Sequence, residues 1–82
     1  MSQSQTLSSL ELGCKARIAG YMKNCKSSYK MKLLALGLTR KTEVLKIKTA
    51  PLGDPMEIEL RGYRLSLRKD EADVVLMEKE EQ

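Results

Sequence analysis

Few residues in this chain could do chemistry. The 82 residues include no His, Trp or Phe, and the two cysteines, Cys14 and Cys25, are eleven positions apart. Without His there is no Ser–His or Cys–His pair for nucleophilic catalysis, and the cysteine spacing does not match a zinc-binding motif. The sequence therefore predicts no catalytic residue, no metal ligand and no cofactor, and we expect a protein that is not an enzyme.

Three carboxylates near the C-terminus, Asp70, Glu71 and Asp73, remain as candidates for a loose cation site. A hard cation needs several converging oxygen ligands. The same residues also fit a short capped turn surrounded by solvated acids, and we favour that interpretation. The neighbouring Arg68 is expected either to pair with Asp70 or Glu71 or to face a partner.

Charge is distributed unevenly along the chain. Glu11 to Lys48 carries ten Lys or Arg and two acids, whereas Asp70 to Gln82 carries one Lys and six acids. A basic half of this kind can face phosphate, an acidic protein or anionic lipid, or it can simply keep a small protein in solution. The candidates for a basic partner-binding patch are Lys30, Lys32, Arg40 and Lys41.

The segment from Ala50 to Pro55 is a second candidate for partner binding. Its prolines restrict the backbone on both sides of a Gly-Asp pair, which is typical of a stiff turn. A stiff loop loses little entropy when it docks, although a turn of this kind can also serve folding alone. The candidate binding residues of this loop are Pro51, Leu52, Gly53, Asp54 and Pro55.

The elements that must position these residues are short. Alternating apolar and polar residues predict strands over 14–18, 43–50, 56–61, 63–68 and 74–78. A helix is expected from Ser28 to Leu36, with Ser27 or Ser28 as its N-terminal cap and Gly37 at its C-terminal end. One further helical turn is expected over 69–73.

About five short strands and one helix are too little for a two-sheet sandwich. We therefore predict a mainly β fold, a small SH3-like barrel with the helix inserted between the first and second strands. A flexible N-terminal segment is expected over 1–9, the barrel domain over 10–78, and an acidic tail over 79–82. The predicted core contains Met56, Ile58, Leu60, Tyr63, Leu65, Leu67, Leu33, Leu36, Leu45 and Ile47.

Three motifs occur in a distinctive order. They are Lys32-Leu33-Leu34-Ala35-Leu36-Gly37-Leu38, the loop Ala50-Pro51-Leu52-Gly53-Asp54-Pro55, and Leu65-Ser66-Leu67-Arg68-Lys69-Asp70-Glu71-Ala72. Together they resemble the ferrous iron transport protein A (FeoA) family over roughly residues 10–78. One departure concerns the turn after Gly37-Leu38, where the family usually has Pro-Gly. This chain has Thr39-Arg40-Lys41-Thr42 there, so Lys41 is expected at a position that favours glycine.

The resemblance implies a cytoplasmic accessory or regulatory protein of bacterial ferrous iron uptake. Its expected partner is the cytoplasmic domain of a GTPase-containing ferrous iron permease, which would bring it to the membrane periphery, and self-association is also open. One alternative is a small basic barrel that binds nucleic acid, although three Tyr give little base stacking. Another is the SH3-like interaction module of an iron-dependent regulator. No segment approaches the roughly 20 apolar residues needed to cross a bilayer.

Overall fold

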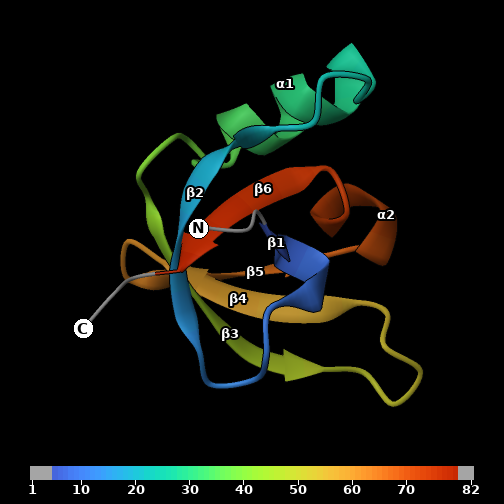
Figure 1. Ribbon diagram of the computed structural model, residues 1–82. Coiled ribbons are helices and arrows are strands. Elements are labelled where there is room, and N and C mark those ends of the chain that lie inside the picture. The colour runs from blue at the N-terminus through green and yellow to red at the C-terminus, as the bar shows by residue number, and fades with distance from the viewer. Residues whose placement is uncertain (1–4, 80–82) are drawn as a thin grey trace.

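The fold is a strongly curved sheet with two helices, seen in a computed structural model that describes residues 5–79 (Figure 1). The elements, in chain order, are β1 (Gln5–Thr6), the 3-10 helix η1 (Leu7–Ser9), β2 (Lys15–Tyr21), α1 (Ser27–Ala35), β3 (Glu43–Thr49), β4 (Met56–Leu60), β5 (Tyr63–Leu67), α2 (Lys69–Ala72) and β6 (Val75–Lys79). The strands follow the order β1-β6-β2-β3-β4-β5, and all pairs are antiparallel.

The expected fold class, a mainly β SH3-like barrel with α1 between its first long strands, is confirmed. Two details differ among the described residues. A sixth strand, β1, pairs with β6, and β1 and β5 stand at opposite ends of the strand order, so the sheet is not closed.

The β4–β5 hairpin follows the sequence pattern closely. Met56, Ile58 and Leu60 are buried, as predicted. The connecting turn contains two residues, Arg61 and Gly62, both with positive φ (51° and 87°), which is the geometry that suits a tight hairpin. Strand β4 therefore ends one residue earlier than expected.

The predicted phase of β3 is wrong. Leu45 and Ile47 were expected in the core, but they are only half-buried, and Val44 and Lys46 point inward. The register explains the reversal, since Lys46 pairs with Ile58 and side chains of paired residues share a face. The Lys46 ammonium is accommodated because its Nζ donates to the Ser8 carbonyl at 3.2 Å. Burial lowers the pKa of Lys46 below its usual value.

The N-terminal residues 5–9 belong to the folded unit, where the sequence led us to expect a flexible segment. Leu7 and Leu10 are fully buried, and η1 packs against β6 and α2. The apolar side chains at these two positions therefore belong to the hydrophobic core. Residues 1–4, and residues 80–82 of the predicted acidic tail, lie outside the described residues.

Helix α1 begins at Ser27 without a side-chain cap, so the expected serine cap is wrong. Its C-terminal end is as predicted: Gly37 has φ 101°. The amide N–H groups of Gly37 and Leu38 donate to the carbonyls of Leu34 and Leu33, both at 3.0 Å, which is a Schellman motif. Within the helix only Leu33 is fully buried, and Figure 1 shows α1 standing off from the strands.

Candidate functional site

The loop between β3 and β4 is held in shape by its own backbone. The Ala50 amide donates to the Pro55 carbonyl at 2.9 Å, and the Gly53 amide donates to the Ala50 carbonyl at 2.8 Å. Gly53 has φ 87°, which a residue with a Cβ adopts only under strain. The side chain of Leu52 is 95% exposed at the tip. The five loop residues are thus brought together, with a leucine presented to solvent.

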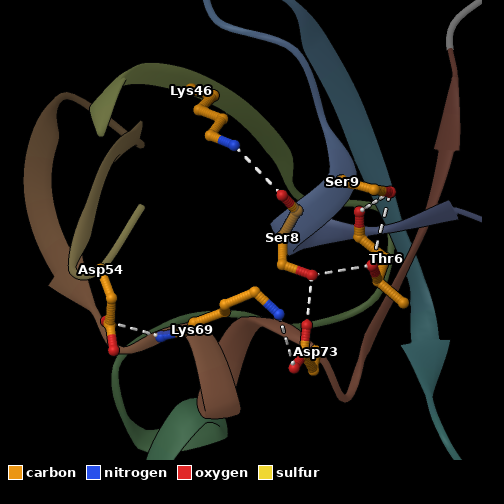
Figure 2. Close-up of polar contacts among 7 residues, drawn as sticks. All are labelled: Thr6, Ser8, Ser9, Lys46, Asp54, Lys69 and Asp73. Carbon is orange, nitrogen blue, oxygen red and sulfur yellow. Dashed lines mark hydrogen bonds and ion pairs between the residues drawn. The ribbon is translucent and has the colours of Figure 1, made fainter. Parts of the chain in front are cut away.

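Asp54 joins this loop to α2, fifteen positions further along the chain. Its Oδ1 accepts the backbone N–H of Lys69 at 2.9 Å (Figure 2). The N–H groups in the first turn of a helix have no partner within the helix, so Asp54 supplies one of the missing acceptors. The sequence placed Asp54 in a stiff turn, and the structure shows that its carboxylate also contacts another element.

A shallow surface depression of about 240 Å³ lies at the base of the loop. It is lined by Lys48, Thr49, Ala50, Pro51, Pro55, Glu57 and Ser66. Two prolines, one lysine and one carboxylate give it an apolar wall and polar edges. Such a surface could receive a partner side chain beside Leu52.

The four basic candidates are not used in the same way. Lys32 forms an ion pair with Glu71 of α2, with 2.5 Å between Nζ and Oε2. Lys30 places its Nζ 6.0 Å from the centre of the Tyr21 ring, and the Arg40 guanidinium lies beside Gly20. Lys41 adopts φ 69° in the turn after α1. The expected single patch is therefore divided between a structural ion pair and an exposed basic surface.

Glu71 is a buried acid that connects α1 with the N-terminal end of α2. Its Oε2 accepts Nζ of Lys32, and its Oε1 accepts the backbone N–H of Arg68 at 3.1 Å. Burial raises the pKa of Glu71, but the hydrogen bond from Lys32, the one from the Arg68 amide and the positive charges of both residues together lower it below its usual value. Arg68 itself immediately precedes α2, so the structure gives this candidate a position at a helix terminus.

A polar cluster that the sequence did not reveal attaches the N-terminal segment to α2 (Figure 2). The Ser8 hydroxyl donates to Oδ1 of Asp73, and it also shares a hydrogen bond with the Thr6 hydroxyl at 3.0 Å. Lys69 Nζ reaches Oδ2 of Asp73 at 3.5 Å. The run of Ser and Thr before Leu10 was the only signal in the sequence, and it looked like a flexible segment.

Two tyrosines fix the C-terminal end of α1. Tyr21 of β2 donates its hydroxyl to the Leu38 carbonyl at 2.6 Å, and burial, followed by the nearby Cys25, raises the pKa of Tyr21 to about 12. Tyr63 of β5 donates to the Leu36 carbonyl. Tyr63 was expected in the core but is 42% exposed, because its ring reaches outward to make this bond. Leu65, also expected in the core, is half-buried.

Within residues 5–79, the Cys, Asp and Glu side chains form no group of three or more that could hold a metal ion. Asp73 is engaged by Ser8 and Lys69, and Asp70 is exposed. Over the same residues, no helix is long and apolar enough to span a membrane. The described site is thus a stiff loop next to a small helix that ion pairs and hydrogen bonds hold in place.

Comparison with known proteins identifies the family. A family model for the FeoA domain matches residues 5–79. An NMR structure of a FeoA-like protein from Clostridium acetobutylicum is 35% identical, with 100% of this chain and 93% of that chain covered and a TM-score of 0.87.

Two further structures extend the likeness. The crystal structure of Stenotrophomonas maltophilia FeoA complexed with zinc, an SH3 domain protein, is 27% identical over 89% of this chain and 88% of that one, with a TM-score of 0.77. A manganese-dependent transcriptional repressor shares the fold alone, at 8% identity and a TM-score of 0.85, with 98% of this chain and 44% of the repressor covered. With a family match across all the described residues and a 35% identical relative covered almost end to end, this chain belongs to the FeoA domain family.

Proposed function

We propose that this protein is a non-catalytic accessory protein of bacterial ferrous iron uptake. In this proposal it acts in the cytoplasm and docks on the cytoplasmic part of a GTPase-containing ferrous iron permease. Membership of the FeoA domain family supports the link to ferrous iron transport.

The observation that carries the proposal is the loop from Ala50 to Pro55. A leucine that is 95% exposed stands at the tip of a segment whose backbone is tied to itself and, through Asp54, to α2. A leucine gains free energy when another surface removes it from water, and a rigid loop loses little entropy on docking, so the display of Leu52 favours contact with another surface. The depression beside Pro51 and Pro55 would enlarge that contact.

Exposed basic residues near α1 would guide the approach of an acidic partner. Charges at the rim of an interface mainly set the association rate, whereas buried contacts set the dissociation rate. Lys30, Arg40 and Lys41 are exposed and available for this role. Lys32 is better assigned to the fold, because its ammonium already pairs with Glu71.

The test is binding kinetics against the immobilised soluble domain of the permease at low and high salt. Leu52→Ser should speed dissociation, and Leu12→Ser, which changes another exposed leucine in a different loop, should bind like the parent. Reversal of charge in Lys30→Glu with Arg40→Glu should slow association and flatten its salt dependence. If the Leu52 variant and the charge-reversal variant both bound like the parent, neither surface would be the docking site.

Nucleic-acid binding is the competing function, favoured by the basic half of the chain. Phosphate contacts made by Lys and Arg give an affinity that falls steeply with salt and does not depend on an apolar loop. Nucleic-acid binding would replace the proposed function if two results were found together. The protein would bind duplex or single-stranded nucleic acid with a salt-sensitive affinity that Leu52→Ser leaves unchanged, and it would not bind the permease domain.

A further inference from the structure

A long segment of this protein contains no acidic residue. Between Leu12 and Thr42 the chain has eight basic residues and no Asp or Glu: Lys15, Arg17, Lys23, Lys26, Lys30, Lys32, Arg40 and Lys41. This segment folds into β2, α1 and their connections, and Figure 1 shows β2 running across the molecule to α1 at the top of the view. No acid of the segment itself offsets this charge, while Glu43 and Glu78 lie opposite Arg17 in the neighbouring strands and Glu71 pairs with Lys32.

The outward side of α1 carries exposed apolar residues after the two exposed serines of its first turn, Ser27 and Ser28. Residues three and four positions apart share one face of a helix, so Met31, Leu34 and Ala35 form a common surface, here called the apolar ridge. Met31 is 69% exposed and Leu34 is 39% exposed, while Leu33, on the opposite side, is fully buried. A helix that only covered a core would carry polar residues along this ridge.

Lysines border the apolar ridge. Each helical residue turns about 100° from the last, which puts Lys30 on one flank of the ridge and Lys32 on the other. Lys26, which immediately precedes the helix, is exposed and lies with its Nζ 5.7 Å from the centre of the Tyr29 ring. Long lysine side chains at the edge of an apolar surface can keep their ammonium groups among anionic headgroups while the apolar residues sink deeper.

The shape and charge of this surface indicate which kind of partner it can bind. A second copy would bring two positive surfaces face to face, which like-charge repulsion disfavours. An extended peptide needs a groove, and the surface depressions near Lys15 and Arg61 and near Pro51 contain no residue of α1. A projecting apolar helix edged by lysines suits a fluid anionic surface instead.

We propose that the apolar ridge of α1 binds an anionic lipid bilayer directly, with Met31 and Leu34 in the interfacial layer and Lys26 and Lys30 against the headgroups. This contact is separate from the docking of the Ala50–Pro55 loop and does not depend on it. It would hold the protein weakly at the membrane surface, because only a short helix and a few charges take part.

The chain lacks Trp, so one introduced Trp reports on its own environment. Leu34→Trp should show a blue-shifted emission with vesicles of phosphatidylcholine containing one phosphatidylglycerol in four lipids, and little shift with phosphatidylcholine alone. Leu52→Trp places the same reporter on the exposed loop and should not shift. High salt should reverse the shift at position 34. The proposal would be overturned if anionic vesicles at low salt did not shift the emission wavelength of the Trp at position 34.

Sedimentation with the same vesicles, using variants without Trp, separates the ridge from charge alone. Met31→Ser with Leu34→Ser should weaken binding to anionic vesicles by about tenfold, since two interfacial side chains are lost, whereas Leu52→Ser should bind like the parent. Lys30→Gln should weaken binding more than Lys48→Gln, which changes an exposed lysine of β3.

All the altered side chains are exposed or half-exposed, and urea unfolding checks that each variant remains folded. Equal vesicle binding by the ridge variant and Leu52→Ser would overturn the proposal. The proposal would also be overturned if the ridge variant lost binding to the permease domain and the parent did not bind vesicles. That result would assign α1 to a protein partner. Loss of permease binding in Leu52→Ser with vesicle binding intact would show that the two contacts are independent.

Discussion

At the scale of single residues, Lys41 is the clearest point of backbone strain. It has φ 69°, and its amide donates to the Ile18 carbonyl at 2.7 Å, so the turn cannot relax without losing that bond. A left-handed conformation costs a residue with a Cβ about 1–2 kcal/mol, more than the roughly 0.5–1 kcal/mol entropic penalty of glycine. Lys41→Gly should therefore stabilise the protein by up to about 1 kcal/mol, measured by urea denaturation.

Arg40→Gly is the matched control for this prediction. Arg40 is also exposed and adjacent in the chain, but it does not have positive φ, so glycine there brings only its entropic cost. We expect Arg40→Gly to be less stable than the parent. If Lys41→Gly were equally destabilised, the turn would not be strained at Lys41.

At the scale of elements, α2 connects three other parts of the molecule and is here called the joint. This four-residue helix receives Lys32 from α1 on Glu71, and Ser8 from the N-terminal segment on Asp73. The β3–β4 loop reaches it through Asp54 and the Lys69 amide. So short a helix has little stability of its own, and its position depends on these contacts from three directions. A substitution at this joint should consequently alter the positions of both α1 and the β3–β4 loop.

Glu71→Gln should cost about 1–3 kcal/mol of unfolding free energy at neutral pH, because the buried ion pair loses its charged acceptor. The folded-state pKa of Glu71 lies below its ordinary value of 4.5. The unfolded state therefore binds more protons between the two values. The stabilisation by this carboxylate is complete above pH 4.5 and disappears as the pH falls through the folded-state pKa. The difference between parent and variant should shrink accordingly in acid.

The measurement for Glu71 is chemical denaturation of parent and variant at neutral and acidic pH. Asp70→Asn is the control, since Asp70 is the exposed neighbour in the same helix, and it should change stability little at either pH. A stability difference for Glu71→Gln that stayed constant down to strongly acidic pH would show that the carboxylate charge is not what stabilises the joint.

At the scale of the whole molecule, we expect the fold to be independent of metal. His is absent from the sequence, and acids and cysteines of residues 5–79 do not converge in groups of three. A metal that bound only the native state would stabilise it by mass action. Anaerobic titration with Fe²⁺ should show no stoichiometric tight binding, and a chelator should leave the melting temperature unchanged. About one iron per chain at micromolar affinity would contradict this expectation.

The sequence by itself determined the features that depend on neighbouring residues. Alternation of apolar and polar residues was enough to place Met56, Ile58 and Leu60 in the core of β4, because side chains of a strand point to opposite faces. Gly37 ended α1 as predicted, since its positive φ is a local property of the turn. Residue types alone excluded catalytic pairs that need His. The motifs shared with the FeoA family indicated the family correctly.

Tertiary structure decided what depends on partners far away in the chain. Alternation marks two faces of β3, but only the pairing of Lys46 with Ile58 and the carbonyl of Ser8 decided which face lies inside. The N-terminal segment looked flexible, yet Leu7 is fully buried in the core. Lys32 looked like part of a binding surface until Glu71, 39 positions away, was found beside it. A local pattern cannot contain such contacts, because their free energy arises only when distant segments pack together.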